Sequence, residues 1–233
     1  MNVLPNVSTT SIRSAIVNLK DAGNYQKDAI NTAFAAYQAG AKLPLHYLGI
    51  GLTAVVFNDS NGFAWKVARR SSGTLFLMLE REYEFFRAAK TVPSIAKHIL
   101  RVYGFNREQV AIKRECLWGI PGRWADMTRL FELHKAIGHA TEKIGWTPPE
   151  FKEDSYVFPS GGRPPVLVDG GFSHRIGPAL VRYVKDIIRG KRPVHDCTND
   201  LAFDIRREVS YKTITPQAAK SLTKHLLLIR RGN

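Results

Sequence analysis

The stretch from Leu48 to Lys66 most constrains the fold, because it combines two closely spaced glycines with two strand-forming runs. It reads L-G-I-G-L-T-A-V-V-F-N-D-S-N-G-F-A-W-K. Residues 55–57 are predicted as a strand, residues 58–62 as a turn and residues 63–67 as the returning strand. Glycines let the backbone approach a bulky anion, and an ammonium group on the facing strand can reach the same anion. The stretch therefore predicts a hairpin that holds a phosphate-bearing ligand.

The glycine spacing fits the protein-kinase pattern G-x-G-x-x-G-x-V, with alanine replacing the third glycine. The fixed positions of this pattern are Gly49, Gly51, Ala54 and Val56. Ala64-Trp65-Lys66 fits the A-x-K of the next strand, whose lysine holds the α- and β-phosphates of ATP. The region therefore resembles the amino-terminal lobe of a protein kinase. The resemblance implies nucleotide contacts from Gly49, Ile50, Gly51, Val56, Ala64 and Lys66.

Composition limits the class of protein. With 233 residues, 44% of them hydrophobic, the chain can form one domain or two closely packed lobes. Its formal net charge of +14 suits nucleic acid, an anionic membrane surface, an acidic protein or a polyanionic nucleotide. No apolar run approaches the ~18 residues of a spanning helix, and no usual secretory signal is seen. Cys116 and Cys197 lack metal-site spacing, so a reducing compartment is expected.

Two helical regions are predicted around the hairpin. Residues 11–40 form two helical pieces, broken near Gly23, that cover the sheet. Residues 74–90 form a long helix. In a kinase-like lobe a carboxylate on this helix orients the strand lysine through an ion pair. The string R-E-Y-E-F-F-R-A-A resembles the corresponding helix of atypical kinases and points to Glu82, with Glu80 in reserve and Glu84 expected to be solvated.

The segment after this helix resembles the connection between kinase lobes. Residues 99–105 and 109–113 are predicted as strands, and the string R-E-C-L-W-G follows them. The resemblance implies that the backbones of Glu115 and Leu117 meet the adenine of ATP. Arg114 stands where kinases usually have a neutral residue, which leaves the register open by one residue.

A second acidic position follows in the carboxy-terminal half. Residues 124–145 are predicted as a helix whose His134 and His139 are packed or surface side chains rather than metal ligands. The apolar run at 166–168 then ends abruptly in Asp169-Gly170-Gly171, which brings an acid to the edge of a sheet. This string resembles the D-F-G element, with glycine for phenylalanine. The resemblance implies that Asp169 ligates the Mg²⁺ that bridges the phosphates of ATP.

The catalytic base is less clearly marked, because the sequence has no H-R-D string. Asp154 is the best candidate: it precedes Asp169 by a short predicted hairpin. A carboxylate near the incoming hydroxyl orients it and accepts its proton late in the transfer. Pro159 stands where the family has a metal-binding asparagine. Glu150 and Glu153 are the alternatives for the base.

The remainder of the chain is predicted to be helical at 179–188, 200–209 and 216–229. The segment 172–178 is very short for an activation loop and has no A-P-E element. Basic side chains gather in this region, either as solvated helix faces or as a dock for an acidic protein. They are Arg189, Lys191, Arg192, Arg206, Arg207, Arg230 and Arg231.

Taken together, these motifs resemble the minimal protein-kinase effectors of the HopBF type over about residues 45–190. The resemblance implies an α+β, compact bilobal kinase-like fold, with a small antiparallel-sheet amino-terminal lobe and a reduced helical carboxy-terminal lobe. Its expected parts are a helical extension at 1–43 and lobes at 44–117 and 118–233. It further implies a Ser/Thr kinase that uses ATP and Mg²⁺. Such a kinase is secreted by bacteria through type III secretion into the host cytoplasm, where it phosphorylates the ninety-kilodalton heat-shock chaperone.

Three alternatives stay open from the sequence. One is a kinase-like enzyme that phosphorylates a small molecule. Another is a non-enzymatic basic module that binds nucleic acid, although the basic tail lacks the interleaved aromatic residues that favour this reading. A pseudokinase that binds ATP without transfer is the third. A monomer without membrane association is expected.

Overall fold

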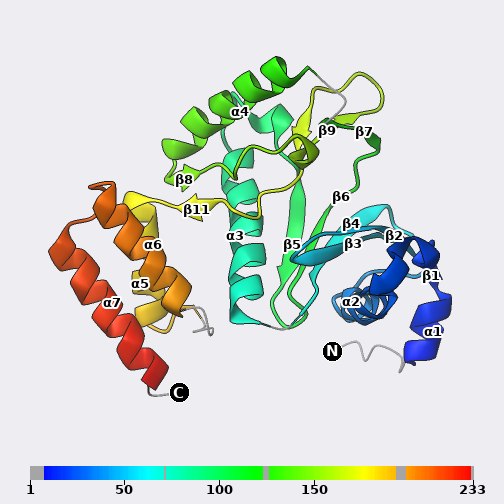
Figure 1. Cartoon of the computed structure of the whole chain (residues 1–233), viewed down its shortest axis with the longest axis horizontal. Helices are drawn as coiled ribbons and strands as arrows, with labels where there is room; N and C mark the ends of the chain where they lie inside the picture. Colours follow the sequence, from blue (N-terminus) through cyan, green and yellow to red (C-terminus); the bar gives the residue numbers. More distant parts are fainter. Residues whose placement is uncertain (1–7, 71, 123–125, 193–197, 232–233) are drawn as a thin grey trace. The chain divides into compact units, whose positions relative to one another are not determined.

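The computed structural model describes residues 8–70, 72–122, 126–192 and 198–231. The chain forms two compact units, of which unit 1 comprises residues 1–71 and 100–119, and unit 2 comprises residues 72–99 and 120–233. Strands dominate unit 1 and helices dominate unit 2, so the predicted α+β class is confirmed (Figure 1). Among the described helices, none is both long and apolar enough to cross a bilayer.

Unit 1 is a six-stranded sheet with a helical layer. Its helical segments are α1 (Thr9–Ser14), η1 (Leu19–Tyr25) and α2 (Gln26–Gln38). Its strands are β1 (Ile16–Val17), β2 (Leu45–Ile50), β3 (Ala54–Asn58), β4 (Phe63–Ala68), β5 (Val102–Asn106) and β6 (Ala111–Glu115). The strand order is β1-β2-β3-β4-β6-β5, and only the β1–β2 pair is parallel.

The helical layer of unit 1 packs on one face of this sheet. Small residues on α2, including Ala29 and Ala33, are completely buried against Val55, Phe57 and other apolar side chains of the strands. Alternate residues of a strand point to opposite faces, so this packing fixes which side chains face away from α2. The predicted second helical piece is confirmed. The first piece is shorter than predicted, because residues 16–17 pair with β2 instead of continuing the helix.

Unit 2 combines a long helix, small sheets and a helical layer. Its helices are α3 (Gly73–Lys90), η2 (Ala96–His98), α4 (Met127–Glu142), η4 (Glu153–Ser155), α5 (Gly177–Ile188), α6 (Thr198–Ser210) and α7 (Pro216–Arg231). Its short strands are β8 (Trp146–Thr147), β9 (Tyr156–Pro159), β10 (Val166–Leu167) and β11 (His174–Arg175). Strand β7 (Gly119–Pro121) lies where the chain passes from unit 1 into unit 2 and joins β9 and β10 in one sheet. The predicted helix start at Trp124 lies outside the described residues.

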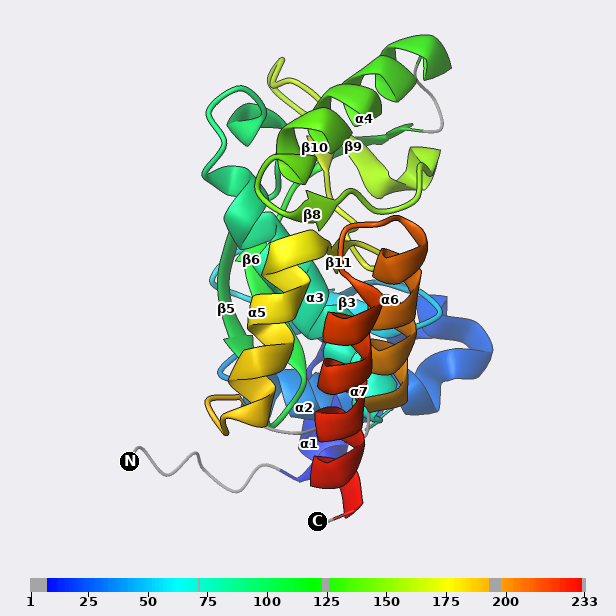
Figure 2. The same cartoon turned by 90° about the vertical axis from the view of Figure 1, so that its left-hand side faces the viewer.

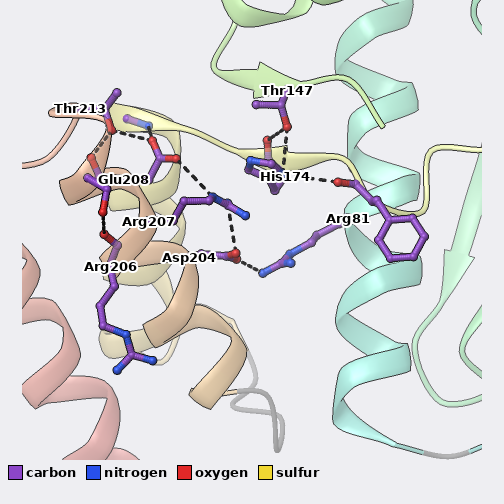
Figure 3. Close-up of polar contacts among 11 residues, drawn as sticks. Arg81, Thr147, His174, Asp204, Arg206, Arg207, Glu208 and Thr213 are labelled. Carbon is purple, nitrogen blue, oxygen red and sulfur yellow. Dashed lines mark hydrogen bonds and ion pairs between the residues drawn. The ribbon is translucent and has the colours of Figure 1, made fainter. Parts of the chain in front are cut away.

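Helices α5, α6 and α7 lie side by side (Figure 2) and share an apolar core that includes Leu77 of α3. Polar contacts reinforce this packing, as Figure 3 shows. Arg81 of α3 forms an ion pair with the buried Asp204 of α6. The buried Glu208 of α6 accepts a hydrogen bond of 2.8 Å from the N–H of Gly177, at the start of α5. The dipole of α5 also stabilises a negative charge at this amino-terminal end.

These contacts explain why the units differ from the expected parts 1–43, 44–117 and 118–233. Helix α3 was expected with the sheet lobe, yet it belongs to unit 2. The amphipathic pattern of α3 does not show which partner it packs against. Leu77 joins the α5–α7 core, and Arg81 is anchored by Asp204. The helical extension likewise belongs to unit 1, because residues within 1–43 supply half of the buried core residues of this unit.

The hairpin turn between β3 and β4 depends on one buried carboxylate. Asp59 is 3% exposed. Its Oδ1 accepts from the N–H groups of Asn61 and Phe63 at 3.0 and 2.9 Å. Its Oδ2 accepts from Nε1 of Trp65 at 2.9 Å and from the N–H of Lys42 at 3.3 Å.

We expect Asp59→Asn to lower the free energy of unfolding by about 3 kcal/mol. The NH₂ group of the asparagine would face N–H groups that now donate to the carboxylate, and these would lose their acceptor while staying buried. Urea titration followed by tryptophan fluorescence measures this change. Asp21→Asn, the same change at an exposed position, serves as control and should stay within about 0.5 kcal/mol of the wild type. Equal stabilities of the two variants would contradict the role given to Asp59.

Candidate functional site

In unit 1 the candidate site begins at the glycine-bearing turn between β2 and β3. The pairing of the two strands shifts between Tyr47 and Gly49, and Gly49 then lies opposite Val56. The N–H of Gly51 closes the turn on the Ala54 carbonyl at 2.8 Å. Leu52 at its tip is 91% exposed. A Cβ at Gly49 would meet no atom within 4 Å, so the backbone there is open to close approach by a ligand.

The strand register places Lys66 in the same row as the glycine turn. Gly49 pairs with Val56, Val56 with Lys66, and Lys66 with Ile112. Paired residues point to the same face of a sheet, and this face is opposite to the one that α2 covers. Lys66 is 8% exposed. Its neighbours along β4, Trp65 and Val67, belong to the α2-side core. Ala64 lies two residues before Lys66 and so on its face.

Arg69 links the glycine turn to the helical layer, a contact that the sequence did not indicate. Its Nη1 donates to the carbonyl of Gly51 at 3.2 Å. Its Nη2 donates to Oδ2 of Asp28 on α2 at 2.6 Å, and its guanidinium lies 4.9 Å from the centre of the Tyr25 ring. The partners are 18 and 41 positions away in the chain, so no local spacing could have identified the contact.

The predicted adenine-contacting segment begins at the end of β6. The N–H of Glu115 donates to the carbonyl of Arg101 at 2.9 Å, and the Glu115 carboxylate accepts from the N–H of Arg101 at 2.7 Å. The Glu115 N–H is therefore engaged within unit 1. Leu117 follows the end of the strand in an irregular segment. Adenine contacts by these two residues stay a prediction.

In unit 2 the hairpin of β9 and β10 brings two candidate acids to the same end. Tyr156 pairs with Leu167, and the N–H of Val168 donates to the carbonyl of Ser155 at 2.7 Å. Asp154 directly precedes Ser155, and Asp169 directly follows Val168. Both acids therefore leave the open end of the hairpin. Both side chains are exposed.

The carboxylates of Glu82 and Asp169 both lie close to Gly171. The carboxylate of Asp169 accepts from the N–H of Gly171 at 3.1 Å. A Cβ built on Gly171 would lie 3.3 Å from Oδ1 of Asp169 and 3.7 Å from Oε2 of Glu82. The missing side chain thus leaves a small space between two carboxylates. Glu82 is 1% exposed, so its carboxylate is held in this position by the surrounding structure.

The three glutamates of α3 have different partners. Glu80 accepts a hydrogen bond of 2.7 Å from the hydroxyl of Tyr183 on α5. Glu84 forms ion pairs with Arg175 and Arg192, so the expectation that Glu84 is solvated is wrong. The reason is tertiary packing: α5 and the segment before it cover this side of α3. Glu82 is the member of the three that lies beside Gly171.

Gly170 stands where the sequence resemblance expects the phenylalanine of D-F-G, and the structure shows why a glycine fits there. A Cβ on Gly170 would lie 3.2 Å from ring atoms of both Phe85 and Phe86. These two rings, from α3, are fully buried and fill the volume beside the Gly170 backbone. Two consecutive phenylalanines on the helix thus occupy the space that a side chain at position 170 would need.

The other acids differ in their surroundings. Glu150 and Glu153, the alternatives for the base, are exposed, and Glu150 lies 3.8 Å from the ammonium of Lys152.

His134 is buried and shares a hydrogen bond of 2.8 Å with the Tyr156 hydroxyl, as expected for a packed histidine. Burial lowers the pKa of His134, so its ring is neutral at pH 7.

A magnesium ion fits the donor chemistry at the hairpin end. Within residues 8–70, 72–122, 126–192 and 198–231, no group of three or more His, Cys, Asp and Glu side chains could hold a metal. Mg²⁺, however, usually takes one or two carboxylates and completes its shell with phosphate oxygens and water. Asp169, with Asp154 or Glu82 beside it, offers donors of this kind.

Comparisons with known proteins add a distant likeness. No protein-family model and no curated protein matches the sequence. Among solved structures, the Rio2 kinase–ADP/Mg²⁺–phosphoaspartate complex from Chaetomium thermophilum aligns with 90% of this chain and 78% of its own chain. The TM-score of this alignment is 0.43 at 12% sequence identity. A likeness at this level establishes neither an activity nor a site residue.

Restoring the phenylalanine of D-F-G should damage unit 2. We expect Gly170→Phe to lower the free energy of unfolding by about 3 kcal/mol, because Phe85 and Phe86 already fill the space. Gly104→Phe is the matched control, since a Cβ there would meet no atom within 4 Å. Urea denaturation compares the two variants. A Gly170→Phe protein as stable as the wild type would show that the two rings do not restrict this position.

Proposed function

We propose that this chain is an ATP-dependent phosphotransferase of the protein-kinase type. The observation that carries the proposal is the end of the β9–β10 hairpin, where Asp154 and Asp169 emerge together and Glu82 lies beside Gly171. In unit 1, Lys66 stands in register with the glycine turn. The five functional groups follow the chain order of a kinase: glycine turn, lysine, helix glutamate and then the two aspartates.

Each group has a separate task in phosphate transfer. The turn at Gly49 and Gly51 offers backbone to the triphosphate, and Lys66 supplies a positive charge to its α- and β-phosphates. To Glu82 we assign the task that the kinase resemblance implies, to orient the lysine of the nucleotide site. Asp154 orients the acceptor hydroxyl and takes its proton late, because positioning dominates a loose transition state.

Asp169 is the group we assign to Mg²⁺. When bound, Mg²⁺ neutralises the charge of the phosphate oxygens and lowers the barrier to transfer. A carboxylate that leaves a buried strand at an exposed turn suits this task. Strand β10 fixes its backbone, while its oxygens remain accessible to a hydrated ion.

For the acceptor, we propose a serine or threonine hydroxyl of a host protein, with the ninety-kilodalton chaperone as the first target to test. The sequence resemblance to HopBF-type effectors supports this target, together with delivery into the host cytoplasm by type III secretion. The net charge of +14 also favours an acidic protein partner. A small-molecule acceptor would give the same nucleotide chemistry, so the substrate assay must include both classes.

The carboxylate of Asp169 provides the first test. We expect Asp169→Asn to reduce transfer of labelled phosphate from Mg–ATP about a thousandfold, because it removes the charge that holds the ion. Purified chaperone, a eukaryotic lysate and a panel of aminoglycosides serve as acceptors, and Lys66→Ala is the blank. Label in aminoglycosides alone would reject the protein-kinase reading. Wild-type activity in a folded Asp169→Asn protein would reject the site.

The choice of the base is tested by neighbouring carboxylates. We expect Asp154→Asn to lower kcat by about 10² to 10⁴, the usual contribution of a general base. Glu153→Gln and Glu150→Gln make the same charge change at exposed positions nearby and should leave kcat within about twofold. A large loss in Glu153→Gln, with normal rates in Asp154→Asn, would move the role to Glu153.

A further inference from the structure

Unit 2 contains a cavity of about 450 Å³ that shares no residue with the candidate catalytic set. Its walls come from the second half of α3, from α5, and from the segments that hold Trp146, Arg175 and Arg192. Its volume lies in the range of cavities that hold small molecules. Part of α3 and part of α5 line it, so it is formed by regular helices of the folded unit as well as by connecting segments.

The cavity has an excess of positive charge. Four arginines line it, and two carboxylates oppose them. The arginines are Arg87, Arg175, Arg182 and Arg192, and the acids are Glu84 and Asp186. The lining therefore carries a formal charge of +2, and a ligand that neutralises it must be an anion with more than one charge.

The floor of the cavity is held rigidly. The guanidinium of Arg175 lies 3.8 Å from the centre of the Tyr183 ring and 4.6 Å from that of Trp146, and it pairs with Glu84. Arg192 also binds Glu84, at 2.6 Å. Burial lowers the pKa of Arg175 to about 10, so this side chain is still cationic at neutral pH. Oε1 of Glu80 lies 3.8 Å from Nη1 of Arg192 as well, so two glutamates balance the two arginines of the floor and hold them in place.

The rim holds two arginines with less constrained heads. Arg87 on α3 and Arg182 on α5 are both exposed. Neither forms an ion pair with a carboxylate in the described part of the chain, and the Arg87 guanidinium rests 5.6 Å from the centre of the Tyr83 ring. Planar guanidinium groups bind two oxygens of a phosphate at once, which a lysine cannot do.

We propose that this cavity binds a small phosphate-bearing polyanion, such as a diphosphate group. Arg87 and Arg182 bind its phosphate oxygens, while the ion pairs of Arg175 and Arg192 with Glu84 hold the floor in place. A volume of about 450 Å³ matches a small molecule better than a phosphorylated protein segment. Because α3 also carries Glu82, a ligand here contacts the same helix as the candidate catalytic set.

Inorganic pyrophosphate is the probe for this site, with binding measured by isothermal titration calorimetry. We expect wild type to bind it, and Arg87→Gln and Arg182→Gln each to weaken binding at least tenfold. Arg189→Gln is the matched control: it removes an exposed arginine at the end of α5 that does not line the cavity, and it should bind as wild type. Thermal melting confirms that each variant is folded.

Two further arms decide the class of ligand and the location of the site. Lys66 is assigned to the phosphates of ATP, so Lys66→Ala removes pyrophosphate bound at that site. The binding that Arg87→Gln and Arg182→Gln weaken should persist in Lys66→Ala, because Lys66 does not line the cavity. Loss of this binding in Lys66→Ala, or an equal loss in Arg189→Gln, would overturn the assignment. So would the absence of wild-type binding at millimolar pyrophosphate. Binding of a phosphothreonine peptide in place of pyrophosphate would replace the small molecule by a protein ligand and reject the proposal.

Discussion

The hydrogen bond from the N–H of Val168 to the carbonyl of Ser155 is the contact on which the candidate site depends most. It continues the register of β9 and β10 by one residue, so that Asp154 and Asp169 leave the hairpin at the same end. A shift of one residue would turn the side chains of one strand to the opposite face. Val166 and Leu167 of β10 point to opposite faces of the sheet, and both are buried. Their burial therefore opposes such a shift.

Helix α3 organises the rest of unit 2 around this hairpin. Residues four apart lie on the same face of a helix, so Glu80 and Glu84 both reach the Arg192 side, whereas Glu82 points elsewhere and meets Gly171. One helix therefore contributes to the candidate catalytic set on one face and to the arginine-lined cavity on another. In unit 1 the alternation of β4 makes a similar division, with Trp65 and Val67 in the core and Lys66 on the other face.

The sequence predicted elements whose signals are local. The turn with Asp59 and Gly62 between two β-branched and aromatic runs predicted β3 and β4, and the apolar spacing at 74–90 predicted α3 within one residue. It could not predict contacts made by residues far apart in the chain. The strand β1 exists only through its pairing with β2. The partners of Glu84 come from the segment after Asp169, so its burial left no trace in the helix pattern. Arg69, the tether of the glycine turn, was missed for the same reason.

In the proposed function, Lys66 and Asp169 serve one nucleotide and its metal ion. The most direct test of this proposal replaces Mg²⁺ by Mn²⁺ and measures, by electron paramagnetic resonance, the binding of Mn²⁺ in the presence of a non-hydrolysable ATP analogue. We predict a protein–nucleotide–Mn²⁺ complex in the wild type whose affinity for Mn²⁺ falls at least tenfold in Asp169→Asn. The affinity for the nucleotide should fall in Lys66→Ala. The same Mn²⁺ and nucleotide affinities in all three proteins would contradict the account.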